Sequence, residues 1–152
     1  MSEVRSFLER HLQSIFDSDS HTYHETTDET LALYEWYVTP HRIDGFPFHD
    51  FMMAETGRDD TAGLALDPHP VGNSPHDKDR VRFDLANYHE QVFSESAICS
   101  YTMLISKGTS SGVEVLSYNE SRVLVKFDAG WKVVHVHKSP SWNAPFQPPT
   151  GP

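Results

Sequence analysis

The sequence is poor in cysteine, in positive charge and in long apolar runs. A single cysteine, Cys99, excludes an internal disulfide and a cysteine-rich zinc site. Twelve Lys and Arg against 22 Asp and Glu give a net charge of −10, which argues against nucleic-acid binding because phosphate contacts depend on clustered cations. The chain has no run of roughly 18 apolar residues and no signal-peptide order at its N-terminus. We therefore expect a soluble, cytoplasmic protein that binds neither nucleic acid nor membranes.

Several catalytic motifs are also missing. The chain has no Gly-rich phosphate loop, no Gly-x-Ser-x-Gly elbow and no His-Glu-x-x-His helix. Three common enzyme classes therefore lack support, and we expect no cofactor and no metal. What the sequence does have is ten histidines and 12% aromatic residues in 152, a length that suits one domain.

The first part of the chain has mainly helical patterns. Apolar residues from Val4 to Phe16 recur every three or four positions, which predicts a helix capped by Ser2. A weaker helical pattern follows over 19–26, and the aromatic-rich run over 30–38 predicts a strand. A short helix is expected over 46–55. Its inward-facing residues should be Phe48, Phe51 and Met52.

The second part is rich in strand-forming residues. Short turns separate four runs, which predicts an antiparallel meander and hence an α+β fold. The runs cover 81–93, 96–106, 113–127 and 131–138. The pattern disappears over 58–80, which predicts a long loop insertion, and residues 141–152 form a Pro-rich tail. The expected domain is therefore 1–140.

Two histidines lie close together in the last predicted strand. Strict alternation would place His135 and His137 on one face with Trp131 and Val133, and Lys138 on the other. Such a pair can act as acid and base, can supply two ligands to a metal, or can simply form hydrogen bonds at a subunit interface. The pattern alone does not choose between these roles.

A second candidate is the arginine in the preceding strand. Arg122 shares a face with Glu120 and Leu124, where a charged side chain is costly unless it is paired or hydrated. Arg122 therefore either pairs with an acidic neighbour or lines a pocket that accepts a carboxylate. His49, on the short helix, is either an ordinary satisfied side chain or points toward the sheet.

These residues lie in segments that resemble a known family. The segments Glu120-Ser-Arg-Val, Asp128-Ala-Gly-Trp131 and Val134-His-Val-His137-Lys-Ser139 resemble the end of the association (hub) domain of calcium/calmodulin-dependent protein kinase II. The segments Phe48-His49-x-Phe51 and Ala97-Ile-Cys-Ser-Tyr101 are similar to its middle part. The likeness covers nearly the whole chain except the loop from Arg58 to Arg80.

The resemblance implies the cone-like α+β fold of nuclear transport factor 2 and the ketosteroid isomerases, in which helices pack on a strongly curved sheet. In the family these domains pair and stack into rings, and a basic pocket accepts small carboxylates. By position, the resemblance assigns Arg122, His49 and Lys138 to that pocket. Tyr101 and His137 are further binding candidates. Met103 replaces a pocket arginine of the family and Gly57 a movable tryptophan, so the ligand and its lid should differ.

Two functions from different classes follow. The first is a stand-alone association module without a kinase domain, which assembles with copies of itself into a dimer-based ring and binds a small carboxylate. The alternative is a small SnoaL-like or ketosteroid-isomerase-like enzyme, an isomerase, dehydratase or cyclase acting on a small polar substrate. Its candidate catalytic residues would be His49 and Glu120, because a base opposite an oxyanion donor is what such chemistry needs.

Overall fold

The computed structural model describes residues 1–59 and 81–141, and for residues 55–59 the backbone alone. Three helices precede the long strands: α1 (Glu3–Phe16), α2 (Ser20–Thr26) and α3 (Pro47–Asp59). The strands are β1 (Thr27–Tyr34), β2 (Ile43–Asp44), β3 (Val81–Val92), β4 (Ser96–Thr109), β5 (Gly112–Phe127) and β6 (Gly130–Pro140). The predicted α+β class and its curved sheet are confirmed.

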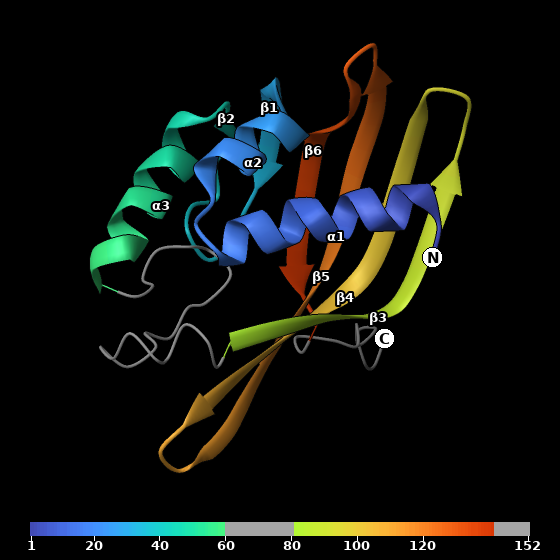
Figure 1. The fold of residues 1–152 in the computed structure, drawn as a ribbon. Helices are drawn as coiled ribbons and strands as arrows, with labels where there is room; N and C mark the ends of the chain where they lie inside the picture. The colour runs from blue at the N-terminus through green and yellow to red at the C-terminus, as the bar shows by residue number, and fades with distance from the viewer. Residues whose placement is uncertain (60–80, 142–152) are drawn as a thin grey trace, which may run out of the picture.

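The strands form one six-stranded sheet in the order β2-β1-β6-β5-β4-β3. All neighbours are antiparallel except β1 and β6, which run parallel. As Figure 1 shows, α1 crosses the concave face of the bent sheet, while α2 and α3 flank the end that carries β1 and β2. The space between α1 and the sheet is where the core and the polar site lie.

Helix α1 forms because its sequence provides both a residue that caps the first turn and a stripe of apolar side chains along one face. The Ser2 side chain accepts a hydrogen bond from the Arg5 amide, which caps the first turn as predicted. Leu8 and Leu12 lie one turn apart and are fully buried, as expected for a stripe of period 3.6 that faces the sheet. The helix therefore packs on the concave face of the sheet along a narrow seam of apolar side chains.

Two elements differ from the prediction. Strand β1 ends at Tyr34 rather than Val38, because Val38 and Thr39 donate hydrogen bonds to the Glu35 carbonyl and turn the chain out of the ladder. In α3, Phe51 is 60% exposed, whereas His49 and Met53 are buried. The predicted inward position of Phe51 was wrong because the helix turns its His49–Met53 face to the core.

A bulge in β6 corrects the predicted strand faces. Val123 pairs with His135 but Leu124 pairs with Val133, so one extra residue interrupts the alternation. Val133 therefore points inward together with Val136 and Lys138, and it does not share a face with the histidines as strict alternation predicted. Without this bulge, either Val133 or Lys138 would have to leave the core.

The loop insertion was predicted over 58–80 and the tail over 141–152. Helix α3 runs past its predicted end at 55 and includes Arg58 and Asp59, so the loop prediction was wrong for these two residues, while 60–80 and 142–152 lie outside the described residues. Within the described part, none of the helices is long and apolar enough to cross a bilayer.

The seam between α1 and the sheet yields the first testable prediction. Leu8→Ala should lower the free energy of unfolding by about 2–5 kcal/mol, because the leucine is fully buried and its loss leaves a cavity. Ser6→Ala, on the exposed side of the same helix, should change it by less than about 0.5 kcal/mol. Urea denaturation of the three proteins measures both. Equal stability of the two variants would contradict the packing described here.

Candidate functional site

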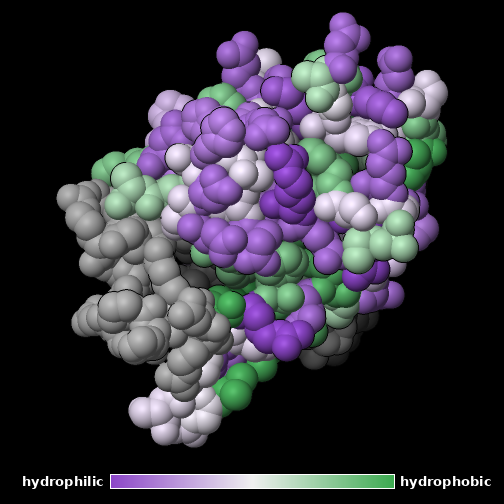
Figure 2. Space-filling model, in the orientation of Figure 1, coloured by the Kyte–Doolittle hydropathy of each residue, from purple (hydrophilic) through white to green (hydrophobic). Residues whose placement is uncertain are grey.

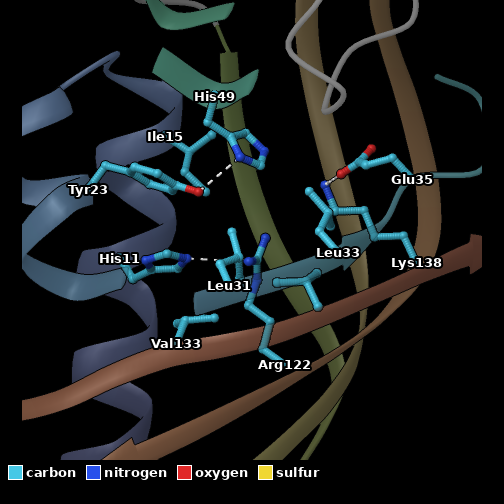
Figure 3. Close-up of a pocket in the computed structure, with 11 residues that line it drawn as sticks. His11, Ile15, Tyr23, Leu31, Leu33, Glu35, His49, Arg122, Val133 and Lys138 are labelled. Carbon is cyan, nitrogen blue, oxygen red and sulfur yellow. Dashed lines mark hydrogen bonds and ion pairs between the residues drawn. The ribbon is translucent and has the colours of Figure 1, made fainter. Parts of the chain in front are cut away.

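A cluster of buried polar residues lies between the helices and the sheet, around a small cavity (Figure 3). The free volume inside the cavity is about 10 Å³, roughly the space of one water molecule. The polar side chains come from several elements: His11 from α1, Tyr23 from α2, His49 from α3, Arg122 from β5 and Lys138 from β6. Glu35 joins them from the turn after β1, and Ile15, Leu31, Leu33, Val133 and Val136 complete the lining.

Arg122 is the centre of the hydrogen-bond network. Its Nε donates to both the Tyr101 hydroxyl and Glu120 Oε1, each at 3.1 Å. The Tyr101 hydroxyl donates to the same Glu120 oxygen at 2.6 Å. All three side chains are at most 4% exposed. Because charge-assisted bonds are the strong ones, this triangle fixes the guanidinium in one orientation.

The same guanidinium determines the tautomer of His11. Arg122 Nη1 lies 3.3 Å from His11 Nε2, and a guanidinium can only donate, so Nε2 must accept. The proton of His11 is therefore on Nδ1, which donates to Thr26 Oγ1 at 2.9 Å. The Thr26 hydroxyl in turn donates to the Thr22 carbonyl at 2.9 Å. Burial and the Arg122 charge lower the pKa of His11 well below its ordinary value, so the ring is neutral.

His49 lies on the opposite wall of the cavity. Its Nδ1 is 3.0 Å from the Tyr23 hydroxyl, and both side chains are buried. Burial, followed by the charges of Lys138 and Arg122, lowers the pKa of His49 to about 3. Burial also raises the pKa of the Tyr23 hydroxyl. Both groups are therefore neutral over the physiological pH range.

Lys138 lies between two carboxylates. Its Nζ forms an ion pair with Glu35 Oε1 and lies 3.9 Å from Glu120 Oε2. Both acids are almost fully buried. Burial raises the pKa of Glu35 more than Lys138 lowers it. For Glu120 burial acts in the same direction, but Arg122, Lys138 and the hydrogen bonds outweigh it and lower the pKa.

The charges of the cluster therefore cancel. Arg122 and Lys138 supply two positive charges, Glu35 and Glu120 supply two negative charges, and both histidines are neutral. The resemblance implies a basic pocket, but in this conformation each cation already has an internal carboxylate. Among the described residues, Glu35 Oε2 and Glu120 Oε2 have no hydrogen-bond partner, and Glu35 Oε1 has only its ion pair with Lys138. Such orphaned oxygens are costly in a protein interior, which makes them the weak points of the cluster.

The structure brings most of the predicted site residues together. His49, Arg122 and Lys138 line the cavity, and Tyr101 and Glu120 lie behind Arg122. His137 does not join them. It is exposed on the outer side of β6, where its ring lies 5.1 Å from that of Tyr34. Arg122 pairs with Glu120, which is the first of the two roles that the sequence left open, and it also lines the cavity, while the acceptance of a carboxylate there stays a prediction.

Three residues of the cluster were missed by the sequence analysis. His11 looked like one polar residue in an amphipathic helix, and Tyr23 belonged to a weakly patterned segment. Glu35 was assigned to the interior of a strand, although it follows the last residue of β1. The run Leu31-Ala-Leu33-Tyr-Glu35 carried a usable signal, because period 2 from the two inward leucines places Glu35 inward as well.

The geometry gives little support to acid–base catalysis by the predicted pair. His49 has its Nδ1 engaged by Tyr23, and a group with a pKa of about 3 is a weak base near neutral pH. Glu120 Oε1 already receives hydrogen bonds from Tyr101 and Arg122. The described residues also contain no group of three side chains placed to hold a metal ion. What the arrangement can do is hold a carboxylate against a lysine and an arginine.

The two neutral histidines predict a dependence of stability on pH. Unfolded histidine titrates near 6.5, so between pH 7 and 5 the unfolded chain takes up a proton that folded His49 does not. The free energy of unfolding should fall across this range by about 2 kcal/mol for each such histidine. Glu35 acts in the opposite direction because its pKa is raised. The measurement is therefore the free energy of unfolding of the wild type and of His49→Gln, determined by urea denaturation at pH 7 and at pH 5. Between these pH values the variant should lose about 2 kcal/mol less of its free energy of unfolding than the wild type does.

His89→Gln provides the control for this experiment, because His89 is exposed on β3 outside the cluster. Its pH profile should follow that of the wild type. If the His49→Gln profile followed the wild type as well, the neutral state assigned to His49 would be wrong.

Comparison with known proteins supports a single family. The protein-family model described as the calcium/calmodulin dependent protein kinase II association domain matches residues 1–66 and 73–142 of this chain. The chain is 26% identical over 149 residues to rabbit (Oryctolagus cuniculus) calcium/calmodulin-dependent protein kinase type II subunit delta. That match covers 97% of this chain and 25% of the relative, so the chain spans about a quarter of the length of the kinase subunit.

Solved structures agree on the fold. The hub homology domain of the kinase from Chlamydamonas reinhardtii superposes with a TM-score of 0.71 at 23% identity, covering 90% of this chain and 95% of that one. A nuclear transport factor 2-like protein from Salmonella enterica serovar Typhimurium gives 0.63 at 17% identity, covering 93% and 92%. The nuclear transport factor 2-like fold is therefore shared, and the family model shows that the chain belongs to the calcium/calmodulin-dependent protein kinase II association domain family.

Proposed function

We propose that this protein is an association module that assembles with copies of itself into a dimer-based ring and binds a small carboxylate in the cavity beside Arg122 and Lys138. The observation that carries the first part is a pair of exposed apolar patches at opposite ends of the sheet. A cytoplasmic location stays a prediction from the sequence.

The first surface, the turn-end patch, consists of Val92, Phe93 and Phe127. They are 50%, 57% and 41% exposed. The Lys126 amide donates to the Glu95 carbonyl at 2.8 Å, which holds the β3–β4 turn against the end of β5. The three residues therefore lie at the same end of the sheet, in neighbouring turns. An exposed cluster of large apolar side chains is typical of an interaction site.

The second surface, the hairpin-end patch, consists of Val113 and Val115, which are 71% and 58% exposed. They alternate along β5 and so share one side of the β4–β5 hairpin. That hairpin projects away from the body of the protein, opposite to the turns that join β3 to β4 and β5 to β6 (Figure 1). In Figure 2 the helical face is mainly hydrophilic, and hydrophobic surface appears near this hairpin and at the edge around β3.

Two separate surfaces are what a ring of dimers requires. One isologous contact makes a dimer and closes there, whereas a ring needs a second contact to join dimers to each other. A monomer whose apolar surface lay in one patch would stop at the dimer. The distance between the turn-end and hairpin-end patches along the strands therefore supports higher assembly, in agreement with the hub and association-domain names of the relatives.

Charge-changing variants test the assembly. Val113→Asp with Val115→Asp should disable the hairpin-end patch, and Phe93→Asp should disable the turn-end patch, because both place a charge where apolar surface must be buried. Native mass spectrometry should find a ring for the wild type, smaller species down to dimers when one patch is changed, and monomers when both are changed. Circular dichroism checks that every variant is folded.

Ser110→Asp with Ser111→Asp is the matched control, since it adds the same two charges at exposed positions in the same β4–β5 turn. It should leave the ring intact. A wild-type protein that is monomeric on dilution would overturn the proposal of self-assembly.

The second part of the proposal concerns the cavity. Arg122 and Lys138 are the cations that a carboxylate would contact, and both are nearly inaccessible to solvent, so water screens their charges little. His49 and Tyr23 add neutral hydrogen-bonding groups on the other wall (Figure 3). Such a mixture of apolar lining and few converging polar groups is typical of small-molecule sites.

Acetate is a suitable probe because it is little more than the carboxylate itself. Titration into the wild-type protein, followed by backbone amide NMR shifts, should move signals of the cavity-lining strands β5 and β6 in a saturable way. Acetamide has the same shape without the charge and should not do so at the same concentrations. Equal responses to the two compounds would show that the cations are not the recognition element.

A further inference from the structure

The cavity already contains a carboxylate of the protein itself. Glu35 is fully buried and its Oε1 is paired with Lys138, while its Oε2 has no hydrogen-bond partner in the part of the chain that the structure describes. In Figure 3 the Glu35 side chain reaches Lys138 from the far side of the cavity relative to Tyr23 and His49. A lysine ammonium with a carboxylate against it, in a lining of aliphatic and neutral polar side chains beside Arg122, is what the complex with an external carboxylate would look like.

The backbone position of Glu35 distinguishes it from the other acid of the cluster. Glu120 lies in the middle of β5, where Tyr101 and Lys138 are its neighbours on β4 and β6. Its Oε1 receives hydrogen bonds from two side chains. Glu35 follows the last residue of β1, and its carbonyl accepts the turn bonds from Val38 and Thr39. Glu120 is thus fixed by two neighbouring strands, whereas Glu35 is held in the cavity mainly by its ion pair.

The small volume of the cavity also indicates that Glu35 must move before a ligand can reach Lys138. A free volume of about 10 Å³ holds roughly one water molecule, which is too little for even a two-carbon acid next to Glu35. An external carboxylate can therefore reach Lys138 only if the Glu35 side chain moves out. Arg122 alone is no substitute for Lys138, because its Nε and Nη1 are already engaged by Tyr101, Glu120 and His11 and the same small cavity limits access to its remaining donors.

We propose that Glu35 is the built-in occupant of the anion site, and that small monocarboxylates bind by replacing the Glu35 carboxylate on Lys138. This inference rests on the proposed carboxylate site and adds a competing group that sets its affinity. A protein whose binding-competent state is only partly populated binds its ligand more weakly by that fraction. Glu35 therefore lowers the apparent affinity for every external carboxylate, and any event that draws the Glu35 turn outward raises it.

Glu35→Ala tests this directly. The substitution removes Cγ, Cδ and both oxygens, which are the heavy atoms of one acetate ion, so acetate can restore the missing group. If the open state is a minor population of about 0.1–10%, the variant should bind acetate roughly 10- to 1000-fold more tightly than the wild type in NMR titrations. Acetate should also raise the melting temperature of Glu35→Ala far more than that of the wild type, whereas acetamide should raise neither.

Two further variants keep the result interpretable. Glu29→Ala removes a carboxylate from an exposed position on β1, the strand that precedes Glu35, and should bind acetate as the wild type does. Glu35→Gln retains the size of the side chain and removes its charge, so a folded protein is available even if Glu35→Ala is too unstable to purify. Glu35→Gln should also bind acetate more tightly than the wild type, because the amide does not compete for the ammonium.

The outcomes separate this inference from the proposed function. Acetate binding that is equally tight in the wild type, Glu35→Ala and Glu35→Gln would overturn the inference and leave the carboxylate site in place. No acetate binding in any of these proteins would overturn the carboxylate site and the inference with it. Tighter binding in the Glu35 variants and not in Glu29→Ala would support both.

Discussion

The burial of the Arg122 guanidinium inside an α+β cone is the constraint on which the rest of the site depends. A cation removed from water loses several kcal/mol of solvation, which only close and complete pairing restores. Glu120 and Tyr101 provide that pairing from β5 and β4, and His11 completes it from α1. Because these partners come from separate elements, the helix and the strands must be in register for the arginine to be tolerated at all.

Other features follow from this constraint. His11 must be neutral, because it accepts a hydrogen bond from a cation, and His49 is kept neutral by burial near the same charges. A second buried cation, Lys138, then needs its own acid, which Glu35 supplies. The bulge in β6 is what brings Lys138 to the inner face while Val133 stays there. The cluster thus determines tautomers, strand register and the position of the turn after β1 together.

Much of this could be predicted from the sequence, for physical reasons that differ between residues. The alternation in β5 placed Glu120 and Arg122 on one inward face, and the regular pairing with β4 and β6 on either side kept that alternation true over this stretch. The resemblance to the association domain brought in His49 and Lys138. In β6 the same reasoning failed, since a single inserted residue reverses the face of everything after it and leaves no mark in composition.

The sequence analysis missed three residues of the cluster for a different reason. His11 and Tyr23 lie on helices whose apolar pattern is satisfied without them, so their roles become visible only when Arg122 is placed opposite. Glu35 lies inward by the period of β1, but strand periodicity says nothing about whether a buried acid has a partner. Long-range pairing, here between residue 35 and residue 138, is information that exists in the fold and not in any window of sequence.

The assembly surfaces and the cavity share one strand. β5 carries Val113 and Val115 near its start, Glu120 and Arg122 in its middle and Phe127 at its end. This strand is continuous, paired with β4 over 112–125 and with β6 over 118–127, so it cannot by itself switch between two arrangements, as coupling between sites requires. The turn at Glu35 lies outside the ladder and ends in the cavity. If ligand binding and assembly influence each other, the part that moves is therefore this turn and not the sheet. The sheet would hold both patches in place whether Lys138 pairs with Glu35 or with an external carboxylate.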